Sequence, residues 1–161
     1  GVLFKRWDLR RGMPWQAPNA VDLLETSHLL EHLTLEEGKG LLAEIHRVLK
    51  PGGLARISMP DLDIMVRQYR LGDMNHFNKV QPQEYIQAPT AGEKFSRLLF
   101  GGTYEHRCVY TFEMLRGFLV EAGFAPEKII RVSAGFSRSE IMMRETQDRH
   151  PLESMFVEAV K

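Results

Sequence analysis

Two histidines spaced four residues apart, His28 and His32, are the first candidates for chemistry in this sequence. If the segment between them is helical, both rings face the same way. Either ring could then serve as a general base. The alternative for each is a structural histidine whose ring nitrogens are satisfied by neighbours. The spacing also invites a metal site, but no Glu-x-x-His partner set accompanies it, so we expect no metal here.

A second polar group contains Tyr104, His106 and Arg107, which end an irregular stretch of the chain. We expect these side chains to contact a substrate, with His106 as a further catalytic candidate; the alternative is an ordinary polar loop. The only cysteine, Cys108, follows directly. A thiol nucleophile is conceivable there, but a free cysteine usually behaves as a small hydrophobe. We therefore interpret Cys108 as a partly buried bystander.

The composition is that of a globular domain. The 161 residues, 43% hydrophobic and 26% charged, suffice for one hydrophobic core and predict a single domain. Lys plus Arg equals Asp plus Glu at 21 each, which removes any unspecific attraction to nucleic acid or to an anionic membrane. The sequence has no apolar run of about 18 residues, and its first residues do not show a charged-then-apolar pattern. With one cysteine, these features predict a cytoplasmic protein that binds neither nucleic acid nor membrane.

The best-marked helix begins after Thr34, because Thr34 and Glu37 have the spacing of a capping box. The run Pro51-Gly52-Gly53 is expected to end this helix, with glycine supplying the left-handed conformation. Apolar periodicity and turn residues predict the other elements. We expect strands over 2–9, 20–26, 54–59, 128–132 and 154–160, and further helices over 62–69 and 92–100 and after Thr111.

Strands that alternate with helices predict an α/β fold with a Rossmann-like, mostly parallel sheet. The strand–helix–strand unit over 20–59 favours a parallel pair with a right-handed crossover. The last two strands lack a helix between them, so we expect them to pair antiparallel at one edge. The irregular stretch over 71–107 is predicted to be an insertion that acts as a lid or a binding element.

Several motifs resemble the class I S-adenosylmethionine-dependent methyltransferase family, in particular its type 11-like members. The most specific is Arg-Val-Leu-Lys-Pro-Gly-Gly at a helix end just before a strand. The resemblance covers nearly the whole chain and rests on Trp7-Asp8-Leu9, Leu30-Glu31-His32-Leu33, Glu44 to Gly53, Pro60-Asp61-Leu62, Tyr104 to Arg107, Glu121-Ala122-Gly123-Phe124 and the terminal strand.

The resemblance implies S-adenosylmethionine as cofactor and a small-molecule or glycan-type acceptor. It implies that Asp8 accepts a hydrogen bond from the adenine amino group and that Leu9 lies beside the adenine ring. A turn-forming aspartate is the alternative for Asp8. Ser27, His28 and Leu29 follow the family's fourth strand, where cofactor and acceptor meet. A loop cap is the alternative for Ser27.

The sequence departs from the family in one respect: it contains no Gly-x-Gly-x-Gly turn and no acidic residue ending a preceding strand. We therefore expect the domain to be N-terminally truncated and to begin at strand three. Such a chain alone should bind the cofactor weakly or not at all, and its unpaired sheet edge should favour a homo-oligomer. The alternative function is a non-catalytic interaction or oligomerisation module.

Overall fold

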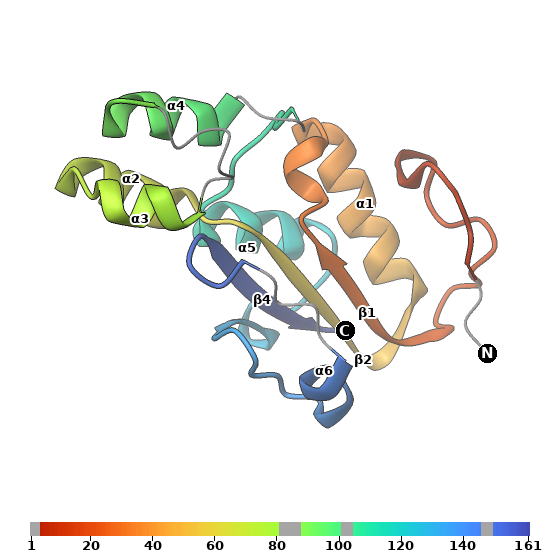
Figure 1. Cartoon of the computed structure of the whole chain (residues 1–161). Helices are drawn as coiled ribbons and strands as arrows, with labels where there is room; N and C mark the ends of the chain where they lie inside the picture. The colour runs from red at the N-terminus through yellow and green to blue at the C-terminus, as the bar shows by residue number, and fades with distance from the viewer. Residues whose placement is uncertain (1–3, 81–87, 101–104, 146–149) are drawn as a thin grey trace.

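In the computed structural model, which describes residues 4–80, 88–100, 105–145 and 150–161, four strands form one sheet (Figure 1). The strands are β1 Val21–Ser27, β2 Leu49–Pro60, β3 Ile129–Val132 and β4 Ser154–Val160. Their order is β1-β2-β4-β3, with β1 parallel to β2 and with β4 antiparallel to both β2 and β3. The predicted α/β class and the antiparallel pairing of the last two strands are confirmed, with β3 as the edge strand.

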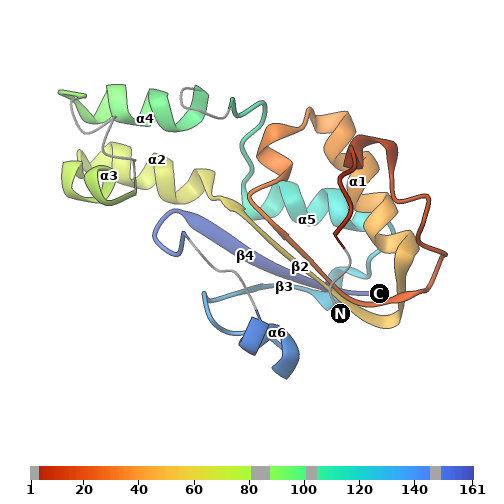
Figure 2. The same cartoon turned by 45° about the vertical axis from the view of Figure 1, so that its right-hand side comes forward.

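Helices cover both faces of the sheet. They are α1 Leu35–Val48, α2 Leu62–Leu71, α3 Met74–Val80, α4 Ala91–Phe100, α5 Phe112–Glu121 and α6 Glu140–Glu145, with short 3-10 turns η1 Leu9–Arg11, η2 Leu30–His32 and η4 Pro126–Lys128. Figure 2 shows α1 and α5 on one face and α6 on the other, while α2, α3 and α4 group together beyond one end of the strands. No helix in the described part of the chain is long and apolar enough to cross a membrane.

Helix α1 forms for the predicted reason. The Thr34 hydroxyl accepts from the Glu37 backbone N–H, and the Glu37 carboxylate accepts from that of Thr34 at 2.9 Å. This reciprocal cap satisfies two N–H groups that a helix start leaves free. The apolar stripe Leu41, Leu42, Ile45 and Val48 is buried against the sheet and α5. Local signals thus fix where α1 begins and which face it buries.

The end of α1 differs from the prediction. The helix stops at Val48, and Leu49 is already extended and paired in β2. Gly52, at φ +80°, lies beyond this point and serves a turn within the long strand β2. A Cβ at Gly53 would come within 2.9 Å of the Lys50 carbonyl oxygen. The Gly-Gly pair therefore permits a close backbone approach and does not cap the helix.

The predicted strand over 2–9 is wrong for the residues described. Residues 4–8 have no regular structure, and the chain then forms η1. A strand requires a ladder partner, and β1 pairs only with β2 in the described sheet. The segment is held instead by α1, because Glu44 Oε1 accepts from the Met13 N–H at 2.6 Å and Arg47 donates to the Gln16 carbonyl at 3.0 Å.

The remaining helices match the predictions with two additions. Helices α2, α4 and α5 lie where periodicity placed them, and the Thr111 hydroxyl accepts from Met114 N–H as the cap of α5. Helices α3 and α6 were not predicted. Each has seven residues or fewer, and each buries one large side chain, Phe77 in α3 and Met142 in α6. One buried position is too few to produce a recognisable apolar stripe.

Candidate functional site

The site lies where the carboxyl ends of β1 and β2 meet the first residue of β4. His28 follows β1 directly, and its N–H donates to the Ser58 carbonyl at 2.9 Å, which extends the β1–β2 ladder. Its backbone has φ +48°, a left-handed conformation that non-glycine residues rarely adopt. The strain turns the chain sharply from β1 into η2. Such strained positions cluster at functional sites.

The His28 ring is held at both nitrogens. Nδ1 lies 3.0 Å from Glu31 Oε1, and Nε2 lies 2.9 Å from the hydroxyl of Ser154. The side chain is still 22% exposed, so one edge of the ring reaches the surface. A carboxylate this close to Nδ1 orients the ring, although the contact lacks the geometry of a good hydrogen bond. This arrangement suits a histidine that takes up a proton at Nε2.

Glu31, in η2, is the most deeply buried acid of the site, with 1% of its side chain exposed. Neither carboxylate oxygen accepts a hydrogen bond of good geometry from the part of the chain that the structure describes, although Oε1 is close to His28 and 3.9 Å from His32 Nε2. Its backbone carbonyl accepts from the N–H groups of Arg107 and Cys108, at 2.7 and 3.2 Å. These bonds bring the later segment that contains His106 to the end of β1.

His32 and His106 face each other with ring centroids 5.2 Å apart. His32 Nδ1 lies 3.2 Å from the Glu105 carbonyl, and His106 Nδ1 lies 2.9 Å from the Leu98 carbonyl. A carbonyl can only accept, so Nδ1 carries the proton in each ring and Nε2 keeps its lone pair. Burial lowers the pKa of His106, which favours the neutral ring, although the nearby Glu31 opposes this shift.

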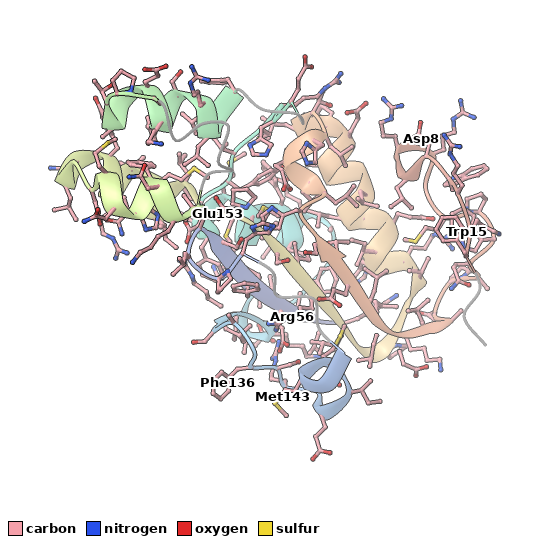
Figure 3. The ribbon with its side chains drawn as sticks, in the orientation of Figure 1. Asp8, Trp15, Arg56, Phe136, Met143 and Glu153 are labelled. Atoms are coloured by element: carbon pink, nitrogen blue, oxygen red, sulfur yellow. The ribbon has the colours of Figure 1, made fainter. Side chains whose placement is uncertain are left out.

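An open pocket of about 450 Å³ is lined by His28, Glu31, His32, His106 and His150. Glu153 contacts one of these lining residues, with its Oε1 3.2 Å from His150 Nδ1. Burial raises the pKa of Glu153 to about 7; the Glu31 charge adds to the shift and His28 opposes it. Glu153 directly precedes β4, and Figure 3 shows it at that end of the strand. The pocket thus combines four imidazoles with the buried carboxyl group of Glu31, and the poorly solvated carboxyl group of Glu153 lies next to one of its lining residues, His150.

The structure brings the three predicted catalytic candidates, His28, His32 and His106, into this one pocket. Ser27 ends β1 and Leu29 packs partly buried against the core, so both flank it. Their assigned roles stay predictions. Arg107 contributes its backbone N–H to Glu31. Tyr104 lies outside the described residues.

The two predicted adenine contacts lie apart from this pocket. Asp8 caps η1, and its two oxygens accept from Arg10 at 2.9 and 2.8 Å, which lowers its pKa to about 2. Leu9 packs against the core. In Figure 3, α1 lies between Asp8 and Glu153. The observed role of Asp8 is the turn-forming one, and its cofactor role stays a prediction.

Sequence reasoning missed three residues of the site: Glu31, His150 and Glu153. A signal existed only for Glu31, which follows His28 by three positions and precedes His32. Cys108 is the bystander expected, because it packs partly buried against the core and burial raises the pKa of its thiol. A thiol with a raised pKa is a poor nucleophile near neutral pH.

The strand order and the polar pocket define the class of protein. A parallel β1–β2 pair with a connecting helix, and a pocket outside the carboxyl ends of its strands, is the arrangement of Rossmann-like α/β proteins. Residues 5–57 match the model of a family described as a methyltransferase domain. No curated protein matches the chain.

Two solved structures share the fold. The S-adenosylmethionine-dependent methyltransferase of Archaeoglobus fulgidus is 14% identical, with a TM-score of 0.56 over 98% of this chain and 66% of its own. A protein from Thermotoga maritima, described as a possible histamine N-methyltransferase, is 14% identical, with a TM-score of 0.54 over 94% of this chain and 61% of its own. The chain therefore has the class I methyltransferase fold, which confirms the resemblance. It spans less than two thirds of the length of either structure.

Proposed function

We propose that the protein transfers a methyl group from S-adenosylmethionine to a small-molecule or glycan-type acceptor, in the cytoplasm. The observation that carries the proposal is the His28–Glu31 pair at the carboxyl end of β1, the edge where this fold binds its ligands. The family match over residues 5–57 and the similar structures, which are methyltransferases, support the reaction class.

The residues present fit the reactive half of the cofactor. Its sulfonium is cationic, and the pocket is lined by the carboxyl group of Glu31, with that of Glu153 nearby, in surroundings that screen charge poorly. Ser27, His28 and Leu29 would hold this half of the cofactor at the strand end. No Gly-x-Gly-x-Gly turn is present for the adenosine half. Asp8 would have to exchange Arg10 for the adenine amino group.

In this proposal His28 is the general base. When bound, the cofactor would supply an activated methyl group for transfer to a nucleophilic atom of the acceptor. The acceptor loses its proton to Nε2 of His28, the nitrogen now 2.9 Å from Ser154 Oγ. Glu31, 3.0 Å from Nδ1, stabilises the imidazolium that forms. His32 and His106 line the same pocket and orient the acceptor.

The insertion over 71–107 is proposed to bind the acceptor. Helices α2 and α4 lie side by side in Figures 1 and 2, and Tyr69 stacks on Phe95 with centroids 4.9 Å apart. The segment that follows α4 carries His106 into the pocket. An acceptor seated there would contact both the insertion and the base.

A substitution of His28 tests the proposal in the full product of the gene. We expect S-adenosylhomocysteine to bind, as measured by calorimetry, and to be released from S-adenosylmethionine when a panel of hydroxylated small molecules and oligosaccharides is supplied. His28→Asn should lower turnover about 100-fold or more and leave the affinity for S-adenosylhomocysteine within a few-fold. His46→Asn, remote on α1, is the matched control and should retain turnover. Absence of both binding and turnover in the wild type would overturn the proposal.

The alternative function is a non-catalytic interaction module. It is supported by the position of β1 at the end of the described sheet order, since an edge strand presents unpaired backbone groups to another chain. Light scattering separates the two functions when combined with calorimetry. Concentration-dependent association without cofactor binding favours the module, and cofactor binding by a monomer favours the enzyme.

A further inference from the structure

We propose that Glu31, His32 and His106 bind one divalent transition-metal ion, of which Zn²⁺ is the representative. One ligand atom from each residue lies within 4.8 Å of the other two. Two residues come from η2 and the third from the segment that follows α4, so the fold assembles the site from distant parts of the chain. The spacing of His28 and His32 in the sequence does not by itself reveal this set of three ligands.

The separations are close to those of a bound site. Zn²⁺ binds imidazole nitrogen and carboxylate oxygen at about 2.0–2.2 Å, which places tetrahedral ligand atoms roughly 3.4 Å apart. Movements of about 1 Å in the side chains would therefore close the set around an ion. His32 is about one-third exposed and can move this far, whereas Glu31 is fixed by burial.

Both histidines are already oriented as ligands. A metal-binding histidine almost always donates its other N–H to a carbonyl, a carboxylate or water, which fixes the ring and its tautomer. His32 and His106 do this through Nδ1, to the carbonyls of Glu105 and Leu98. Nε2 is therefore the unprotonated nitrogen of each ring, the atom that can coordinate a metal ion. Nε2 of His32 already lies 3.9 Å from the Glu31 carboxylate.

Glu31 provides an independent observation that points to a ligand. Its side chain is 1% exposed, and among the described residues no group donates a hydrogen bond of good geometry to either oxygen. A buried carboxylate without donors is costly unless a cation compensates it. The nearest candidate within the chain is the His28 ring at Oε1, on one side of the carboxylate. A metal ion held with His32 and His106 would supply the missing charge and bonds.

The ligand set narrows the identity of the ion. Two imidazoles and one carboxylate suit zinc, iron and neighbouring transition ions, whereas Mg²⁺ and Ca²⁺ prefer oxygen ligands only. Three protein ligands on an open pocket leave at least one position for water or for an oxygen of a small molecule. The site is thus of the open kind that can polarise a bound hydroxyl group.

Metal binding can be measured without any methyl-transfer assay. The metal-free full-length protein is dialysed against Zn²⁺ with a competing chelator, and the retained metal is counted per chain. We expect about one Zn²⁺ for the wild type, and affinities lowered about tenfold or more by Glu31→Gln, His32→Asn and His106→Asn. The controls His46→Asn and His76→Asn remove other partly buried histidines and should bind within about twofold of the wild type.

Co²⁺ provides a second readout, since its visible spectrum reports the ligand geometry. Circular dichroism verifies that each variant is folded; should Glu31→Gln unfold, the two histidine variants decide. The proposal is overturned if the wild type retains no more metal than a His32→Asn/His106→Asn double variant. Cofactor binding and turnover are not measured here. Failure of this site therefore leaves the proposed function standing, and failure of methyl transfer leaves the metal result standing.

Discussion

Two buried glutamates, Glu158 in β4 and Glu31 after β1, are placed in opposite ways. Both are at most 1% exposed. The Glu158 carboxylate accepts from Arg56 at 3.0 Å, from the Arg138 backbone N–H at 3.0 Å and from the Ser137 hydroxyl. The Glu31 carboxylate accepts no hydrogen bond of good geometry from residues 4–80, 88–100, 105–145 or 150–161. The Glu158 carboxylate is thus surrounded by hydrogen-bond donors, whereas the Glu31 carboxylate lacks them among these residues.

The number of hydrogen-bond donors around a buried carboxylate distinguishes one that stabilises the fold from one that can bind a ligand. Arg56 is itself fully buried and donates also to the Phe136 carbonyl at 2.9 Å, so this network ties the loop before α6 to the centre of the sheet. Figure 3 shows Arg56 between the strands and the part of the chain that carries Phe136 and Met143. A satisfied pair of this kind has nothing left for a ligand. A buried carboxylate without donors, on an open pocket, retains its capacity to bind.

Breaking the saturated network should produce the largest effect. Glu158→Gln removes the charge that compensates Arg56, and a guanidinium cannot lose its proton to escape burial. We expect unfolding free energy to fall by about 3–5 kcal/mol, measured by chemical denaturation. An Arg56→Met/Glu158→Met double variant should recover much of this loss, since it leaves no buried charge from the pair. Additive losses in the double variant would show that the two residues are not coupled.

Glu153 is a third poorly solvated glutamate, and its titration should make the stability of the protein depend on pH. Burial raises its pKa in the folded protein to about 7, above the ordinary value of 4.5, so the folded state favours the protonated form. Its stabilising contribution is complete below about pH 4.5 and is lost as the pH rises through 7. Relative to Glu153→Gln, the wild type should lose on the order of 3 kcal/mol across this window. Parallel denaturation curves for the two proteins at every pH would contradict the assignment.

The sequence predicted those parts of the fold that local signals determine. The capping box at Thr34, the cap at Thr111 and the alternation of strands and helices each act over a few residues, and the structure agrees with them. The strand over 2–9 was wrong because pairing is a long-range property that an apolar run does not reveal. Helices α3 and α6 were missed because each buries one large side chain.

The site was predictable by residue type but not by geometry. Histidines stand out in a sequence, and His28, His32 and His106 do line one pocket. Glu31 looks like an ordinary glutamate beside a histidine, and only its burial at the strand end makes it distinctive. Glu153 acquires its raised pKa from neighbours far along the chain. The position of Glu31 between His28 and His32 was the only local signal for either carboxyl group.

Removing a single donor from the saturated carboxylate should have a moderate effect. Ser137→Ala deletes the hydroxyl that donates to Glu158 Oε1 and leaves Arg56 and Arg138 in place. A hydrogen bond to a charged group is worth about 1.5–3 kcal/mol, so we expect a loss near 1–2 kcal/mol after partial compensation. Ser133→Ala, exposed in the same loop, is the matched control and should be neutral within about 0.5 kcal/mol.

The substitution Glu31→Gln should have the smallest effect on the free energy of unfolding. Glu31→Gln keeps the shape of the side chain and removes a buried charge that lacks donors, at the loss of its contact with His28. The two terms oppose each other, and we expect the unfolding free energy of metal-free protein to change by less than about 1 kcal/mol in either direction. Chemical denaturation in the presence of a chelator measures it beside Glu158→Gln. A loss as large as that of Glu158→Gln would mean that Glu31 holds the fold together, and the contrast between the two carboxylates would fail.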